Sequence, residues 1–168
     1  MDGIAVRLIY SRKSKRLHLV MADMEDRNTL YATSLHVQLW NDRVSCVRSS
    51  NSYRLHRVLM GVEGKRTGPD GKAIVVDHIN LNPCDNRRAN LRIATVRGNC
   101  TNVGLKRTNT SGYKGVCMVH YTRGLPFWRA FVRTPSGRIS KTFKDKVSAH
   151  FWACDMREKY HGDYVRHF

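Results

Sequence analysis

The first third of the chain alternates apolar and polar side chains over short stretches that polar turns separate. A period of two is typical of strands with one buried face. Residues 55–60 instead have helical spacing that ends at Gly61, and the Gly-rich residues 64–71 predict a loop. The alternating stretches predict three strands, at residues 4–10, 17–21 and 34–40.

A hairpin is predicted in the middle of the chain. The apolar run at residues 73–76 predicts a buried strand that ends on Asp77 and His78. Residues 80–86 are polar and rich in turn-forming side chains, so they predict a loop. Residues 90–94 then predict a second strand, which can pair with the first.

A short helix is predicted directly after this hairpin. Thr95 is a suitable N-cap for a helix that runs to Asn102. Residues 103–111 are basic and rich in Thr and Asn, so they predict a linker and a domain boundary. We therefore expect three parts: a strand-rich extension at residues 1–50, a module with the hairpin at 51–104, and a linker with a second module at 105–168.

The last 57 residues predict a three-stranded antiparallel sheet followed by a helix. Three alternating segments are separated by turn signals at residues 122–124 and 135–137. The helix that follows ends at Gly162. We expect an α+β fold overall. The expected strands are residues 113–119, 127–133 and 138–143, and the apolar helix positions are Ala149, Trp152, Ala153, Met156 and Tyr160.

The charge of the chain restricts its function. It carries 30 Lys and Arg against 13 Asp and Glu, for a net charge of +17 and a pI near 10.3. Such self-repulsion is unusual for a metabolic enzyme and predicts a polyanionic partner, of which nucleic acid is the default. Because the basic residues lie along the whole sequence, we expect a long footprint on a double-stranded DNA backbone.

The cysteines and the apolar runs exclude other classes of protein. The five cysteines are widely spaced and form no CxxC pair, so we expect reduced thiols rather than a disulfide framework or a zinc knuckle. No apolar run approaches the ~20 residues of a membrane-spanning helix, and the N-terminus lacks a secretory pattern. We therefore expect a cytoplasmic protein without a membrane partner.

Four polar residues in and after the predicted hairpin suit metal-assisted phosphodiester hydrolysis: Asp77, His78, Asn90 and Asn99. A neutral imidazole can take a proton from water near physiological pH. Carboxylate and amide oxygens suit Mg²⁺ or Mn²⁺. Turn formation is the alternative role for so few residues. Since neighbouring side chains of a strand point to opposite faces, the strand must end or twist at Asp77 and His78.

The whole segment, Asp77-His78-Ile79-Asn80-Leu81-Asn82-Pro83-Cys84-Asp85-Asn86-Arg87-Arg88-Ala89-Asn90-Leu91-Arg92-Ile93-Ala94-Thr95 through Asn99, resembles the HNH homing endonucleases of phages. The preceding residues 53–61 are similar to the same family. The resemblance implies a ββα-metal (His-Me finger) site with one Mg²⁺ or Mn²⁺ ion. It implies that His78 is the general base, that Asp77 and Asn99 bind the metal, and that Asn90 braces the hairpin.

Other polar residues near this segment have less specific roles. His56 is a candidate ligand, but we expect a packed structural histidine at a helix start. Arg87, Arg88 and Arg92 are either solvated surface charges or contacts to the DNA backbone, and the neighbouring nuclease site favours DNA.

The C-terminal module resembles the Apetala-type DNA-binding domain, through the segment 111–116, Trp128-Arg129-Ala130 and the segment 159–164. The resemblance implies a sheet in the major groove with the helix behind it. Alternation places Arg129 and Arg133 on the face away from the helix, where they become DNA contacts, and Lys114 is expected on phosphate. Cys117, Val119 and Ser140-Lys141 depart from the family pattern, which favours backbone anchoring over sequence reading.

The sequence thus predicts a free-standing phage endonuclease that hydrolyses DNA in the infected host cell and leaves a 5′-phosphate. A monomer with one site would nick one strand. Two alternatives stay open: a non-catalytic DNA-binding regulator on the same scaffold, and a phage protein that binds a host protein through residues 1–50.

Overall fold

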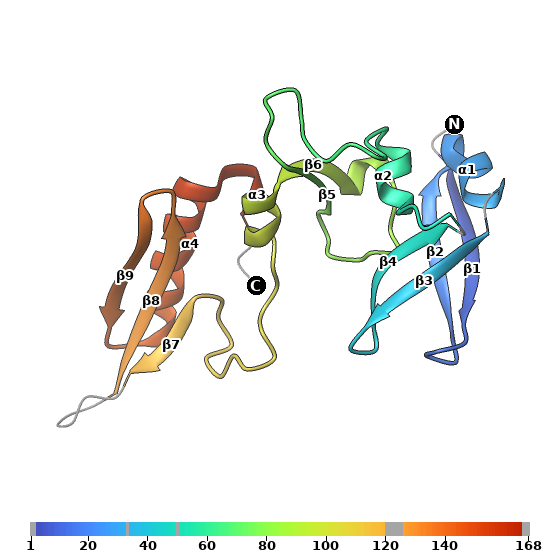
Figure 1. Cartoon of the computed structure of the whole chain (residues 1–168). Helices are drawn as coiled ribbons and strands as arrows, with labels where there is room; N and C mark the ends of the chain where they lie inside the picture. The colour runs from blue at the N-terminus through green and yellow to red at the C-terminus, as the bar shows by residue number, and fades with distance from the viewer. Residues whose placement is uncertain (1–2, 33, 50, 120–125, 166–168) are drawn as a thin grey trace. The chain divides into compact units, whose positions relative to one another are not determined.

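The computed structural model describes residues 3–32, 34–49, 51–119 and 126–165 (Figure 1). It is a mixed α+β protein of small antiparallel sheets and short helices, which confirms the expected fold class. The chain forms two compact units, Met1–Val96 and Arg97–Phe168. The division differs from the expected boundaries after residues 50 and 104.

The N-terminal part of the first unit consists of two hairpins. β1 (Ile4–Ser11) pairs with β2 (Arg16–Asp23), and β3 (Leu35–Trp40) pairs with β4 (Arg43–Ser49). The three predicted strands are therefore confirmed. β4 was not predicted, because a register shift between Gln38 and Leu39 interrupts its pairing and its alternation. The short helices η1 (Met24–Asp26) and α1 (Arg27–Ala32) follow β2 and were also not predicted.

Residues 1–50 and 51–96 share one hydrophobic core, which explains why they form a single unit. The predicted turn of helix is α2 (Leu55–Leu59), and the predicted central hairpin is β5 (Ile74–His78) with β6 (Leu91–Thr95). The 3₁₀ turn η2 (Arg88–Asn90) precedes β6. The core draws buried side chains from α2, β5 and β6, from α1 and from both N-terminal hairpins: Val20, Leu30, Val47, Leu55, Val76 and Leu91.

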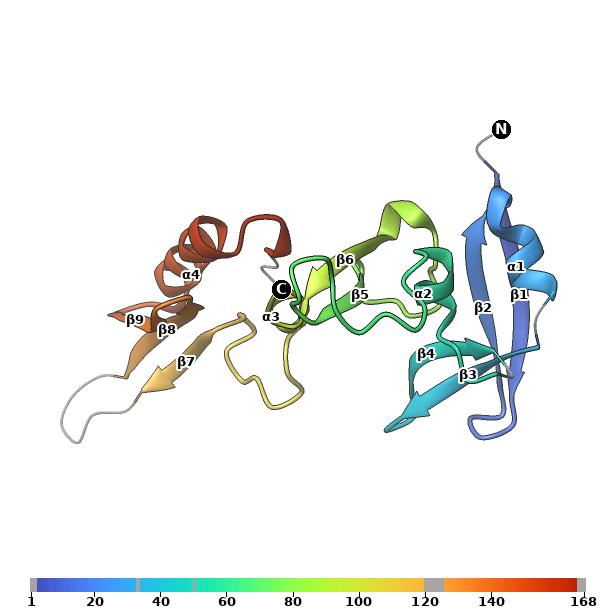
Figure 2. The same cartoon turned by 45° about the horizontal axis from the view of Figure 1, so that its top comes forward.

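The second unit contains the predicted meander and helix. β7 (Val116–Val119), β8 (Phe127–Thr134) and β9 (Gly137–Phe143) form an antiparallel sheet in this order, and α4 (Lys146–His161) packs along one face of it (Figure 2). Trp128, Ala130 and Val132 pack with α4, on the face opposite to the one predicted for Arg129 and Arg133. The predicted turn at residues 122–124 lies outside the described residues. α3 (Val96–Thr101) and η3 (Gly162–Tyr164) complete the elements.

The ends of α4 follow from local chemistry. The Asp145 side chain accepts a hydrogen bond of 2.8 Å from the Ser148 amide and so caps the first turn. Gly162 ends the helix with a positive φ of 51°. Among the expected apolar positions of this helix, Ala149 and Ala153 are fully buried, whereas Tyr160 in the last turn is 39% exposed. Within the described ranges, no helix is long and apolar enough to span a membrane.

Candidate active site

The hairpin of β5 and β6, with its loop, carries three of the four predicted site residues: Asp77, His78 and Asn90. β5 ends at His78, as the geometry of neighbouring strand residues requires. The chain turns immediately: the Leu81 amide bonds to the His78 carbonyl at 3.0 Å, and Leu81 has a positive φ of 64°. Asp77 lies opposite Arg92 in the ladder, and His78 lies opposite Leu91. Asp77 and His78 are thus consecutive residues at the very end of a strand.

Asn90 braces the loop between the two strands. Its Oδ1 accepts the Asn80 amide hydrogen at 2.9 Å. Its Nδ2 donates to Asn80 Oδ1 at 3.0 Å and to the Asp85 carbonyl at 2.8 Å. A buried amide with three such bonds holds both halves of the loop at fixed positions. These contacts give Asn90 the geometry of the bracing residue that the sequence suggested.

The loop is also anchored on the N-terminal hairpin. The Met21 amide donates to the Cys84 carbonyl, and the Asn86 amide donates to the Met21 carbonyl, both at 2.8 Å. These bonds form an isolated parallel bridge between Met21 and Asp85. Residues of β2 therefore fix the conformation of the loop beside His78, a role for residues 1–50 that the sequence did not indicate.

Asn86 and His56 surround the His78 ring. His78 Nε2 lies 3.3 Å from Asn86 Oδ1, and Asn86 Nδ2 donates to the Pro83 carbonyl at 3.4 Å. Because the amide group of Asn86 presents its oxygen, Nε2 carries the hydrogen and Nδ1 is the basic nitrogen. The His56 ring packs edge-on against His78, with centroids 4.9 Å apart and planes at 81°.

Burial controls the protonation of His78. It lowers the pKa of the imidazole below its ordinary value, while Asn86 and the carboxylates of Asp77 and Asp85 act in the opposite direction. The net direction is downward, so the ring is neutral at physiological pH. A neutral imidazole with a fixed tautomer can accept a proton from water.

His56 is the packed structural histidine that the sequence favoured. It is buried, and burial, followed by the charges of His78, Arg54 and Arg57, lowers its pKa to about 3. Its Nδ1 has no hydrogen-bond partner among the described residues. The ring therefore remains neutral in the folded protein over the physiological range.

The low pKa of His56 predicts a specific loss of stability in acid. In the unfolded chain His56 binds a proton with a pKa of 6.5, whereas in the folded protein its pKa is about 3. Between these two pH values only the unfolded chain carries the proton. The free energy of unfolding should therefore be unaffected by His56 above pH 6.5 and fall by up to about 1.4 kcal/mol per pH unit below it. Urea unfolding of the wild type and of His56→Phe between pH 4 and pH 7.5 measures this slope, which the variant should reduce. An equal slope in both proteins would contradict the prediction, and His36→Phe, at an exposed histidine, is the control.

Arg92 fixes the Asp77 carboxylate. Arg92 Nε and Nη2 both donate to Asp77 Oδ2, at 2.9 and 2.7 Å. The Asp77 side chain is only 4% exposed, so the ion pair is largely shielded from water. Cross-strand neighbours in register make this contact directly. The carboxylate beside His78 is thereby held in one position.

Arg87 and Arg88, predicted as DNA contacts together with Arg92, also have carboxylate partners. Arg87 bonds to Asp85 at 2.8 and 2.7 Å, which lowers the pKa of that buried carboxyl. Arg88 bonds to Asp26 of η1 at 2.9 and 2.8 Å. All three guanidinium groups therefore help to hold the loop and the hairpin, and contact with DNA remains a prediction.

Asn99, the second predicted metal ligand, lies on α3 in the second unit, whereas Asp77, His78 and Asn90 lie in the first. The preceding Gly98 is buried, and a Cβ there would lie 2.8 Å from the Tyr164 ring. A glycine in this helix is therefore explained by close packing. Over the described ranges, no group of three or more His, Cys, Asp and Glu side chains has the arrangement of a metal site.

The sheet of the second unit presents its predicted basic face. Arg129 lies opposite Cys117 and Thr142, and Arg133 lies opposite Arg138, so these side chains share the face away from α4. The Arg138 guanidinium lies 4.2 Å from the centre of the Phe131 ring. Arg138 was missed because only the strand register shows which face it occupies. Lys114, expected on phosphate, donates to the Thr101 carbonyl at 2.9 Å.

Comparison with known proteins finds a relative in a bacteriophage. Protein 3.8 of Escherichia phage T7 is 28% identical over 114 residues, which cover 68% of this chain and 92% of that protein. No family model and no solved structure matches the chain. The chain is thus similar to a bacteriophage protein over about two thirds of its length.

Proposed function

We propose that this chain is a metal-dependent DNA endonuclease of the HNH type, encoded by a bacteriophage and active in the infected host cell. The observation that carries the proposal is the end of β5, where the Asp77 carboxylate and the neutral His78 imidazole are consecutive residues of a braced hairpin. The net charge of +17 supports a DNA partner. The relative in phage T7 supports the phage origin.

Each side chain has a role in the proposed hydrolysis. His78 Nδ1 takes a proton from the attacking water, and the hydrogen bond between Nε2 and Asn86 fixes the tautomer in which Nδ1 is the basic nitrogen. Asn90 holds the loop, and Arg92 holds the Asp77 carboxylate. The Asp77 carboxylate would supply an oxygen ligand for one Mg²⁺ or Mn²⁺ ion, whose charge would stabilise the leaving 3′ oxygen. The product carries a 5′-phosphate.

Nicking of supercoiled plasmid tests the proposal. The protein should convert it to the open circle in Mg²⁺ but not in EDTA, because a monomer with one site cuts one strand per binding event. Salt-dependent DNA binding without conversion at any Mg²⁺ or Mn²⁺ concentration would contradict the enzyme. That outcome would instead support the non-catalytic regulator.

The basic face of the second unit should contribute to DNA binding. Replacing Arg129 and Arg133 together by alanine should reduce the slope of log affinity against log salt by about two if both contact phosphate. Lys146→Ala with Lys159→Ala removes the same charge from α4, which covers the opposite face, and should change the slope less. Titration of labelled duplex over a range of salt measures both. Equal effects of the two pairs would contradict a DNA role for this face.

A second candidate function rests on the outer face of β1 and β2. The register pairs Leu8 with Leu19 and Tyr10 with Leu17, so these side chains form one continuous apolar face. All four are 48–63% exposed. An exposed apolar surface of this kind is typical of a protein-binding site. This observation favours a protein partner for residues 1–50, in addition to or instead of cleavage.

Charged substitutions on this face separate the two functions. Leu8→Lys with Leu19→Lys should abolish co-purification of a stoichiometric host protein from infected cells while nicking is retained. Arg12→Ala in the neighbouring turn is the control for a general surface change. An unchanged set of co-purified proteins would contradict the protein-partner function.

A further inference from the structure

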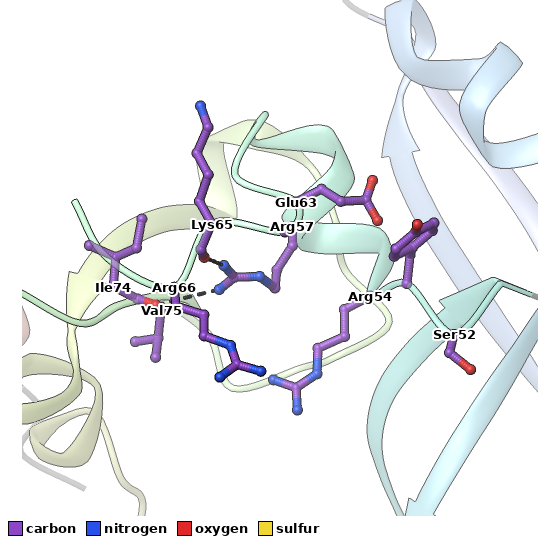
Figure 3. A pocket seen from close by; sticks show the side chains of 10 residues that line it. Ser52, Arg54, Arg57, Glu63, Lys65, Arg66, Ile74 and Val75 are labelled. Atoms are coloured by element: carbon purple, nitrogen blue, oxygen red, sulfur yellow. Dashed lines mark hydrogen bonds between the residues drawn. The ribbon is translucent and has the colours of Figure 1, made fainter. Parts of the chain in front are cut away.

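A basic pocket lies in the first unit, beside β5 and outside the residues assigned to catalysis. It encloses about 420 Å³, a volume within the range of small-ligand sites and sufficient for a nucleotide-sized group. Its wall includes four basic side chains and one acidic side chain (Figure 3). They are Arg54, Arg57, Lys65, Arg66 and Glu63.

Arg57 builds the pocket rather than facing a ligand. Its guanidinium group donates to the carbonyl groups of Val62 at 2.9 Å, of Ile74 at 3.5 Å and of Lys65. These bonds join α2, the following loop and β5 around one cation. The wall of the pocket is therefore held in place by hydrogen bonds, and the guanidinium charge remains there.

Arg54 and Arg66 are available for a ligand. Both are exposed, and Figure 3 shows their side chains extending toward the same side of the pocket. Within the described part of the chain, neither guanidinium group has a hydrogen-bond or ion-pair partner. They differ in this respect from Arg87, Arg88 and Arg92, whose charges are paired with carboxylates. Two unpaired guanidinium groups on one pocket form a strong site for a phosphate.

The pocket is connected to the candidate active site by α2 and β5. α2 begins directly after Arg54, and its His56 packs on the His78 ring. Ile74 lines the pocket four residues before His78, which corresponds to ~13 Å along an extended strand. A separation of this size is within the reach of a few nucleotides of one DNA strand.

We infer that Arg54 and Arg66 bind a backbone phosphate of the DNA strand that the candidate active site cuts, and so position that strand. The inference rests on the DNA partner of the proposed function. Tyr53, an exposed aromatic residue on the same wall, provides a surface for the adjoining sugar or base. Phosphate is favoured over a cationic ligand because the basic side chains outnumber the acidic one.

Salt-dependent binding of a labelled duplex by the full chain tests the inference. Arg54→Ala with Arg66→Ala should weaken binding at low salt and reduce the slope of log affinity against log salt by about one. The control is Arg12→Ala with Lys13→Ala, which removes the same charge from the turn between β1 and β2. If both pairs reduce affinity and slope equally, the pocket is not a phosphate site. Circular dichroism confirms that the variants are folded.

Glu63 gives an independent test of the ligand's charge. Its Oε1 is buried and has no hydrogen-bond partner among the described residues. Glu63→Gln removes a negative charge from the wall, so it should tighten duplex binding. Weaker binding would overturn the phosphate assignment, because it would show that the pocket uses Glu63 to hold a donor or cation.

The nicking assay separates failure of this inference from failure of the proposed function. If the wild type binds and nicks DNA, and the Arg54 and Arg66 double variant behaves like its control, then only the phosphate-binding role of the pocket is rejected. If the wild type binds DNA through the pocket but never nicks it, then the endonuclease function is rejected and the phosphate-binding role of the pocket is kept. If the wild type shows no salt-dependent binding of DNA, then both the endonuclease function and the phosphate-binding role of the pocket are rejected.

Discussion

Replacing His78 by alanine should lower the rate of plasmid nicking by about 10²- to 10⁴-fold, because the variant lacks the group that takes the proton from water. DNA affinity should stay within about twofold, since the neutral ring contributes no charge to phosphate binding. His78→Gln is a second variant, because its amide can still donate toward Asn86 but cannot act as the base. Both variants should be inactive.

His36→Ala is the matched control for these variants. His36 is an exposed histidine on β3, so its removal should leave nicking unchanged. Paired rates and gel-shift affinities are measured on the same preparations, with circular dichroism as a check on folding. More than about a tenth of the wild-type rate in His78→Ala would show that another group activates the water.

Replacing Asp77 by alanine should abolish metal-dependent nicking and also destabilise the protein. The substitution removes the proposed metal ligand and leaves the Arg92 guanidinium, which is 17% exposed, without the carboxylate that accepts its two hydrogen bonds. Breaking a buried pair on one side costs about 3–5 kcal/mol. We expect the lower end of this range, because Arg92 retains some contact with water. Urea unfolding measures the stability, and a Mg²⁺ titration of nicking measures the activity.

The double variant Asp77→Ala with Arg92→Ala separates the two roles of Asp77. It removes both charges, so it should recover part of the lost stability but none of the activity. Asp70→Ala, which breaks an exposed pair with Lys72, should affect neither measurement by much. Recovery of nicking in the double variant would show that Asp77 is structural and would exclude it as a metal ligand.

Local patterns in the sequence were sufficient for most of the secondary structure. In the second unit, the alternation of β8 separated Ala130 and Val132 from Arg129 and Arg133, because neighbouring strand residues face opposite sides of a sheet. The end of β5 at His78 was also predictable, since the chain becomes polar and turn-rich immediately afterwards.

Elements without a clear local period were missed. The hairpin of β3 and β4 turns at Asn41 and Asp42, which both have positive φ, but a register shift disturbs the alternation that would identify β4. The boundary between the compact units also differs from the expected ones: it lies after Val96 rather than after residues 50 and 104. The buried apolar side chains of the two N-terminal hairpins belong to the same core as Leu55, Val76 and Leu91.

The amino-acid sequence is sufficient to place Asp77 and His78 together at the end of β5, because they are neighbours in the chain. The residues that surround them depend on how the chain folds in three dimensions. Asn86 and His56 reach the His78 ring, Met21 anchors the loop, and Arg88 pairs with Asp26, which is 62 residues away. The physical reason is the range of the interactions: period and turn chemistry act over a few residues, whereas hydrogen bonds and ion pairs between distant segments depend on how the hairpins pack.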